Sequence, residues 1–259
     1  MKKFFVLLIS IFMTVLSFAN DKVIKIAASV YPMEHIVKIA AKDLEKQGYK
    51  VEVKLLNDYI TANIGLNAGD FDANFHQHEP FMQEFNKGRN GHLVKVKAIY
   101  DVYVGFYSMK HKKLSQLPKG AKIVIPNDPT NQSRALKMLD DAKLIKLTRK
   151  NGLVSVKDIK STKNHYNIMQ LPIPSLVQAY KEADLVFNWP SHMLKIGVHV
   201  KDALIREKFD KKHPYAIIIS SREDNKNSKK IKDLTKAMTS KKVRDFLKKD
   251  YNQEGFPVF

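Results

Sequence analysis

The sequence predicts an α/β protein made of two lobes that are joined by two crossing strands. Residues 22–55 have the pattern strand, helix, strand, and the same alternation of elements restarts after residue 121. An apolar strand at residues 215–220 follows the second module and can return the chain to the first lobe. Two lobes of this class leave a cleft between them, and such clefts bind small ligands.

The first lobe begins with a β-α-β unit. Residues 22–28 alternate apolar side chains with lysines, and residues 51–55 alternate in the same way, so both stretches are predicted strands. Between them, one helical face carries Ile36, Ile39, Ala40 and Leu44, and Gly48 stands where the helix ends. A helix between two strands predicts that the strands pair in parallel.

Further elements extend this lobe. We expect a helix over residues 60–67 that ends at Gly69, a strand over residues 71–75, a helix that begins at Pro80, and a strand at residues 93–96. Residues 100–108 alternate and predict one long strand that crosses between the lobes.

The second module follows. It has predicted strands at residues 122–126 and 184–188 and predicted helices at residues 132–144 and 175–182, and two amphipathic helices close the chain. The expected division is residues 20–107 with 215–259 for the first lobe and residues 108–214 for the second.

The first nineteen residues have the pattern of a cleaved signal peptide. Lys2 and Lys3 precede an apolar run that ends in small residues at Ala19, and the run is too short for a bilayer-spanning helix. The sequence contains no cysteine, which excludes disulfides, thiol catalysis and a lipid-modified cysteine. The net charge is +19, but the lysines are spread over predicted helix faces without an aromatic-interleaved motif, so we do not expect nucleic-acid binding.

One candidate site is the turn at residues 125–134, Ile-Pro-Asn-Asp-Pro-Thr-Asn-Gln-Ser-Arg. The turn follows a strand and precedes a helix, for which Thr130 and Asn131 are both competent N-caps. The N-terminus of a helix attracts anions, and Arg134 lies about one turn into it, where a guanidinium can bind a carboxylate with two hydrogen bonds. The alternative is an ordinary turn with a surface arginine.

A second candidate is the stretch at residues 70–81, which contains His76, His78 and Glu79. Two histidines on one strand face suit zinc, so a zinc-capturing protein is an alternative, although the donors are fewer than a closed site requires. A ligand pocket and a purely structural pair of histidines are the other interpretations. In a pocket, His76 would make affinity depend on pH near neutrality. No catalytic motif occurs, and Asp70 and Asp72 are more typical of a turn than of a carboxylate pair, so an enzyme is not expected.

These stretches resemble the NlpA-type methionine-binding lipoproteins of ABC importers, over nearly the whole length after residue 20. The matching motifs are Asn57-Asp58-Tyr59, Gly-Asp-Phe-Asp-Ala-Asn at 69–74, Gln-His-Glu-Pro at 77–80, Leu-Pro-Lys-Gly at 117–120, the turn at 125–131 with Arg-Ala-Leu at 134–136, and Phe-Pro-Val-Phe at 256–259. The Pro-Asn-Asp-Pro-Thr-Asn block followed by an arginine is the most specific of them.

The resemblance implies a periplasmic-binding-protein fold of type II-like architecture, with an amino acid held between the lobes. It places Arg134 on the ligand's carboxylate and Asn131 nearby, with amide oxygens for the ammonium group, while Tyr59, His78 and Asn188 line the cleft. His76 and Phe81 are expected to cover the ligand from the first lobe. The implied ligand is L-methionine or a close analogue; another amino acid or a short peptide is the alternative.

The sequence departs from the family pattern at the expected side-chain end of the pocket. His76 replaces an aromatic residue, while Phe81 and Ser191 replace tyrosines, and Trp189 is unusual in its loop. The lipidated cysteine of the family is also missing, so we expect a periplasmic protein without a lipid anchor. The expected partners are an ABC permease with its ATPase. We expect a monomer that needs no cofactor.

Overall fold

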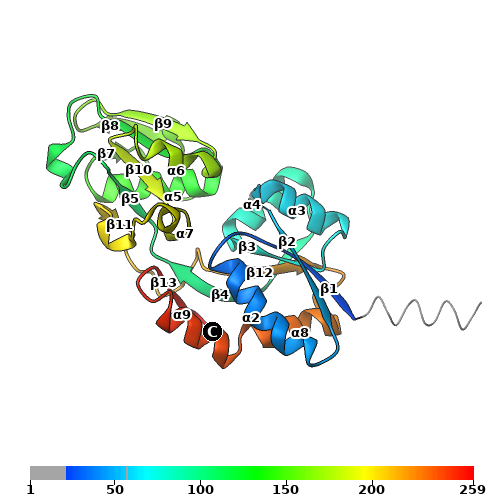
Figure 1. Ribbon diagram of the computed structural model, residues 1–259. Coiled ribbons are helices and arrows are strands. Elements are labelled where there is room, and N and C mark those ends of the chain that lie inside the picture. Colours follow the sequence, from blue (N-terminus) through cyan, green and yellow to red (C-terminus); the bar gives the residue numbers. More distant parts are fainter. Residues whose placement is uncertain (1–21, 57) are drawn as a thin grey trace, which may run out of the picture.

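A computed structural model describes residues 22–56 and 58–259, and it has the two-lobed α/β architecture (Figure 1). The predicted signal peptide lies outside the described residues. Among the described residues, there is no helix with the length and apolar character needed to cross a bilayer.

The first lobe is built on a six-stranded sheet with the order β13-β4-β12-β3-β1-β2. Its strands β1 and β2 pair in parallel, as the β-α-β pattern predicted, and β3 joins β1 in the same direction. β12 pairs antiparallel with both β3 and β4. The elements are β1 (Val23–Ala28), α2 (Met33–Glu45), β2 (Lys50–Leu55), α3 (Tyr59–Ala68), β3 (Ala73–His78), α4 (Glu79–Arg89), β4 (Leu93–Val102), β12 (Ile217–Arg222), α8 (Lys229–Met238), α9 (Lys241–Lys249) and β13 (Gly255–Pro257).

The second lobe contains a five-stranded sheet with the order β11-β5-β10-β6-β9 and a separate β7-β8 hairpin. β6 pairs in parallel with β9 and β10, so the carboxyl ends of β6 and β10 lie at the same sheet edge. Its elements are β5 (Gly105–Tyr107), β6 (Lys122–Pro126), α5 (Pro129–Asp141), β7 (Ile145–Leu147), β8 (Ile159–Thr162), β9 (Asn167–Leu171), α6 (Leu176–Ala179), β10 (Leu185–Asn188), α7 (Pro190–Met193) and β11 (Ile205–Arg206), with short 3₁₀ turns at residues 114–116, 156–158, 173–175, 194–196 and 200–202.

Two chain segments cross between the lobes, from β4 to β5 and from β11 to β12 (Figure 1). The prediction of one strand over residues 100–108 is wrong, because β4 ends at Val102 in the first sheet and β5 begins at Gly105 in the second sheet. The chain therefore passes from the first sheet to the second between Val102 and Gly105. This point precedes the predicted lobe boundary, which followed Tyr107. A side chain at Gly105 would meet Ala203 and the Ile205 carbonyl at 2.8 Å, so only glycine fits where β5 meets β11.

Local signals at two helix ends agree with the prediction. Gly69 ends α3 with a φ of 89°, a left-handed conformation that glycine adopts without strain. Pro80 lies in the first turn of α4, where a missing N–H costs nothing. α3 and α4 therefore flank β3 and fix the direction in which its final histidine points.

Candidate functional site

A small closed pocket lies where the end of β3 faces α5 and the loop after β10. It contains five of the predicted site residues, and its lining is Met33, Tyr59, His76, Gln77, His78, Phe81, Asn131, Trp189, Ser191 and Ile217. Its volume of about 20 Å³ is close to that of one water site. An amino acid can therefore enter only when the two lobes separate and the pocket widens.

A chain of hydrogen bonds crosses this pocket from the first lobe to the second. His78 is the N-cap of α4, and its Nδ1 accepts from the backbone N–H of Phe81 at 3.2 Å. That bond leaves the proton on Nε2, which donates to Oδ1 of Asn131 at 2.9 Å. Asn131 in turn donates from Nδ2 to Asp128 at 3.0 Å. His78 and Asn131 thus connect the lobes through one buried polar contact.

The start of α5 differs from the prediction. The helix begins at Pro129 with Asp128 as its N-cap, and not at Thr130 or Asn131. The Asp128 carboxylate accepts from the backbone N–H of Asn131 at 3.0 Å. Burial raises the pKa of Asp128, while its hydrogen bonds act in the opposite direction. Since a protein carboxylate already occupies this helix terminus, an anion site here must depend on Arg134.

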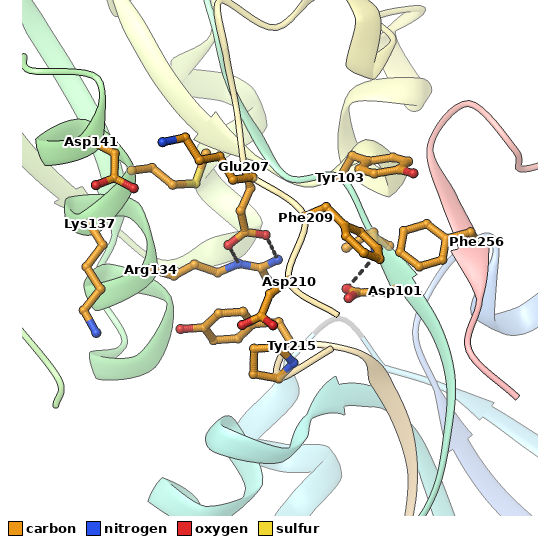
Figure 2. Close-up of a pocket in the computed structure, with 14 residues that line it drawn as sticks. Asp101, Tyr103, Arg134, Lys137, Asp141, Glu207, Phe209, Asp210, Tyr215 and Phe256 are labelled. Carbon is orange, nitrogen blue, oxygen red and sulfur yellow. Dashed lines mark hydrogen bonds and ion pairs between the residues drawn. The ribbon is translucent and has the colours of Figure 1, made fainter. Parts of the chain in front are cut away.

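Arg134 lies in a second cavity, the hinge pocket, of about 210 Å³ beside the crossing segments (Figure 2). Its side chain is 1% exposed, and its Nε donates to Oε1 of Glu207 at 2.7 Å while Nη2 contacts Oε2. The ring of Tyr215 lies 4.1 Å from the guanidinium carbon. Burial alone would lower the pKa of Arg134, but the Glu207 carboxylate raises it. Glu207 was not among the predicted site residues, because nothing in the sequence distinguishes it from the other charged residues at positions 206–212.

The hinge pocket and the closed pocket share a wall. The Tyr215 ring that faces Arg134 also packs edge-on against His78, with ring centroids 5.2 Å apart. The positive charge of Arg134 is one cause of the low pKa of His78, after burial. The Tyr215 ring therefore lies between the guanidinium and the histidine of the closed pocket, and the two cavities are neighbours.

Replacement of Glu207 by glutamine is expected to lower the free energy of unfolding by about 2–3 kcal/mol. The change leaves the buried charge of Arg134 without a carboxylate partner, which costs folding free energy. This cost is smaller than for a fully buried ion pair, because the Glu207 side chain is 21% exposed. Chemical denaturation measures the change. Asp210→Asn removes a charge from the same crossing segment and serves as the control. Equal stability of Glu207→Gln and the parent would show that this ion pair does not support the hinge.

Three of the predicted site residues carry buried polar atoms that have no hydrogen-bond partner in the part of the chain that the structure describes. These atoms are Nη1 of Arg134, Nδ2 of Asn188 and both ring nitrogens of His76. Asn188 is fully buried at the end of β10, and its Oδ1 accepts from the backbone N–H of Trp189 at 3.0 Å and lies 3.1 Å from Nδ1 of His192. Asn188 therefore presents the Nδ2 donor to the interior, while its Oδ1 is engaged by its own loop.

Burial lowers the pKa of each histidine around the site, to about 3 for His76 and His78 and to about 4 for His192. The expected pH dependence of affinity near neutrality is therefore wrong, since a neutral His76 does not titrate between about pH 5.5 and 8.

The histidine pair is poorly suited to zinc. Both nitrogens of His78 have partners, at Phe81 and Asn131, and a metal would have to break these bonds. Within residues 22–56 and 58–259, no group of three or more His, Cys, Asp or Glu side chains is placed to hold a metal ion.

The model of the NlpA lipoprotein family matches residues 24–259. The chain belongs to the NlpA lipoprotein family. It is 35% identical to the methionine-binding lipoprotein MetQ of Bacillus subtilis, over 93% of this chain and 89% of that protein. It is 34% identical to the D-methionine-binding lipoprotein MetQ of Escherichia coli, over 88% of this chain and 86% of that protein.

Solved structures of NlpA-type proteins share the fold. A nutrient-binding protein from Burkholderia cenocepacia bound to methionine has a TM-score of 0.86 at 32% identity, covering 91% of this chain and all of that chain. A putative methionine-binding lipoprotein from Bacillus subtilis has a TM-score of 0.86 at 35% identity, covering 92% and 99%. The predicted two-lobed α/β fold class is thus confirmed. As a member of the NlpA family, the protein is a binding protein and not an enzyme.

Proposed function

We propose that this chain is the periplasmic substrate-binding component of an ABC importer and captures a free α-amino acid between its lobes. Methionine binding in the named relatives makes L-methionine or a close analogue the first ligand to test. The proposal includes a monomer that delivers its cargo to a membrane permease driven by an ATPase.

The pair of unpartnered buried donors is the observation that carries this proposal. Among the described residues, Arg134 Nη1 and Asn188 Nδ2 each lack an acceptor; Asn188 ends β10, and Arg134 lies in the helix that follows the parallel neighbour of that strand, β6. A buried donor without an acceptor costs free energy, and a ligand carboxylate relieves this cost at both atoms. Glu207 holds the other edge of the guanidinium, so it orients Arg134 and leaves Nη1 for the ligand.

The hinge and the contacts between the lobes support a mechanism of opening and closing. Two crossing segments connect the lobes, and the polar contacts across the cleft include His78 with Asn131, at 2.9 Å, and the Tyr59 hydroxyl with His192 Nε2, at 3.4 Å. Such contacts break and re-form at low cost when compared with an apolar interface. The permease then recognises the closed, loaded form, so affinity and lobe equilibrium are linked.

Native mass spectrometry of the protein purified from its own cell envelope tests this function. The proposal predicts that a molecule with an α-amino acid group is carried through purification and released on denaturation. Release of a zinc ion, or of a molecule that has no carboxylate, contradicts it.

A further inference from the structure

His76 is a buried polar side chain that the fold of the protein does not satisfy. It is 4% exposed, and neither Nδ1 nor Nε2 has a hydrogen-bond partner within residues 22–56 and 58–259. The backbone of Tyr59 approaches the ring, but without the geometry of a hydrogen bond. An unsatisfied imidazole in this place costs free energy in comparison with the aromatic residue that fits the same space.

The ring of His76 faces the ligand side of the cleft. It lines the closed pocket, and its centroid lies 5.3 Å from that of Tyr59, whose ring in turn meets Phe81 edge-on at 6.3 Å. Ser191, a residue with a hydroxyl group, lines the same pocket from the second lobe. Two hydrogen-bonding groups therefore stand at the end of the site that is walled by aromatic rings, away from the Arg134–Glu207 pair in the hinge pocket.

The protonation state of His76 selects the chemistry of its partner. Burial lowers the pKa of His76 to about 3, so at neutral pH one ring nitrogen donates and the other accepts. A carboxylate side chain would bring a charge into this buried pocket without a cation there to balance it. A neutral oxygen acceptor can take the imidazole N–H without that cost.

We propose that the side chain of the bound amino acid carries a neutral hydrogen-bonding oxygen that meets His76, as the carboxamide of glutamine or the sulfoxide of oxidised methionine does. This inference rests on the proposed function and names the class of side chain that the same site prefers. In both side chains the oxygen is carried by the δ atom. The thioether of methionine itself is only a weak acceptor and would leave the imidazole N–H without a good partner.

Calorimetric titration of the ligand-free protein with L-glutamine, L-methionine sulfoxide and L-methionine tests the proposal. We expect at least one of the two oxygen-bearing ligands to bind about 10- to 100-fold more tightly than methionine, the effect of satisfying one buried polar group. The variant His76→Phe should reverse this order and favour methionine. His35→Phe makes the same change on the exposed face of α2 and should leave the order as in the parent.

The outcomes separate this inference from the proposed function. Tighter binding of methionine than of both other ligands by the parent protein overturns the inference and leaves amino-acid capture standing, and this result needs no variant to fold. An oxygen preference that persists in a folded His76→Phe variant overturns the role given to His76. If none of the three ligands binds and a wider panel of amino acids also fails, the proposed function falls and this inference falls with it.

Discussion

Replacement of Arg134 by alanine should weaken amino-acid binding by about 2–5 kcal/mol, since a buried carboxylate loses its charged partner. In affinity this is a loss of roughly 30- to several-thousand-fold. Arg134 is the one of the seven predicted site residues that carries a permanent positive charge, and its Nη1 has no partner among the residues that the structure describes. Isothermal titration of the parent and the variant measures the effect.

Lys137→Ala provides the control for Arg134→Ala. Lys137 lies on the same helix and lines the same hinge pocket. Its Nζ donates to the carbonyl of Gly152 at 2.7 Å, and among the described residues it forms no hydrogen bond with Glu207. Its replacement removes a positive charge of α5 and should change affinity by less than about 1 kcal/mol. Comparable losses in both variants would indicate a general electrostatic effect, and undiminished binding by Arg134→Ala would place the carboxylate elsewhere.

The free energy of unfolding is expected to fall steeply as the pH drops below about 6.5. His76, His78 and His192 have folded-state pKa values of about 3, 3 and 4, below the ordinary histidine value of 6.5. Between these limits the unfolded chain binds protons that the folded chain does not, so stability is complete above pH 6.5 and is lost toward pH 4. Three such groups give a slope of up to about 4 kcal/mol per pH unit, enough to unfold a domain of ordinary stability at moderately acid pH.

Denaturation curves recorded between about pH 7 and pH 4.5 measure this slope, and variants assign it. His192→Phe should reduce the slope by about one third. Carboxylates with lowered pKa, such as Asp158 and Asp233, act below their ordinary value of 3.8 and so outside this window. A stability that stays constant down to about pH 5 would mean that these imidazoles are protonated in the folded protein.

Local sequence patterns predicted the elements that carry the site. The strand at Lys122–Pro126 was predicted with its observed bounds, because a short apolar run ends there in a proline turn. The same pattern predicted a helix after the turn, so Asn131 and Arg134 were placed at the sheet edge where they lie. Gly69 and Pro80 bracket β3, but the strand runs over Ala73–His78 and not over the predicted residues 71–75, so His76 and His78 lie within the strand and not in a turn after it.

Features that depend on contacts between distant residues were not predictable from the same patterns. Glu207 reaches Arg134 across 73 residues, and the break between β4 and β5 arises because β5 pairs with the distant strands β10 and β11 of the second sheet. The choice of Asp128 as N-cap, among three adjacent residues able to cap, is set by the network that runs from His78 through Asn131. The unpartnered state of His76 is likewise a property of packing and is not visible in the sequence.

Arg134 and Asn188 together are expected to hold the carboxylate of a free amino acid. Calorimetric titration of the parent protein with two matched pairs, L-methionine with L-methioninamide and L-glutamine with L-glutaminamide, tests it most directly. The amide differs from the acid only where the buried donors are expected to bind, and its loss of charge should weaken binding by about 100-fold or more. Binding of an amide as tight as that of its acid, or failure of both acids to bind, would contradict the account.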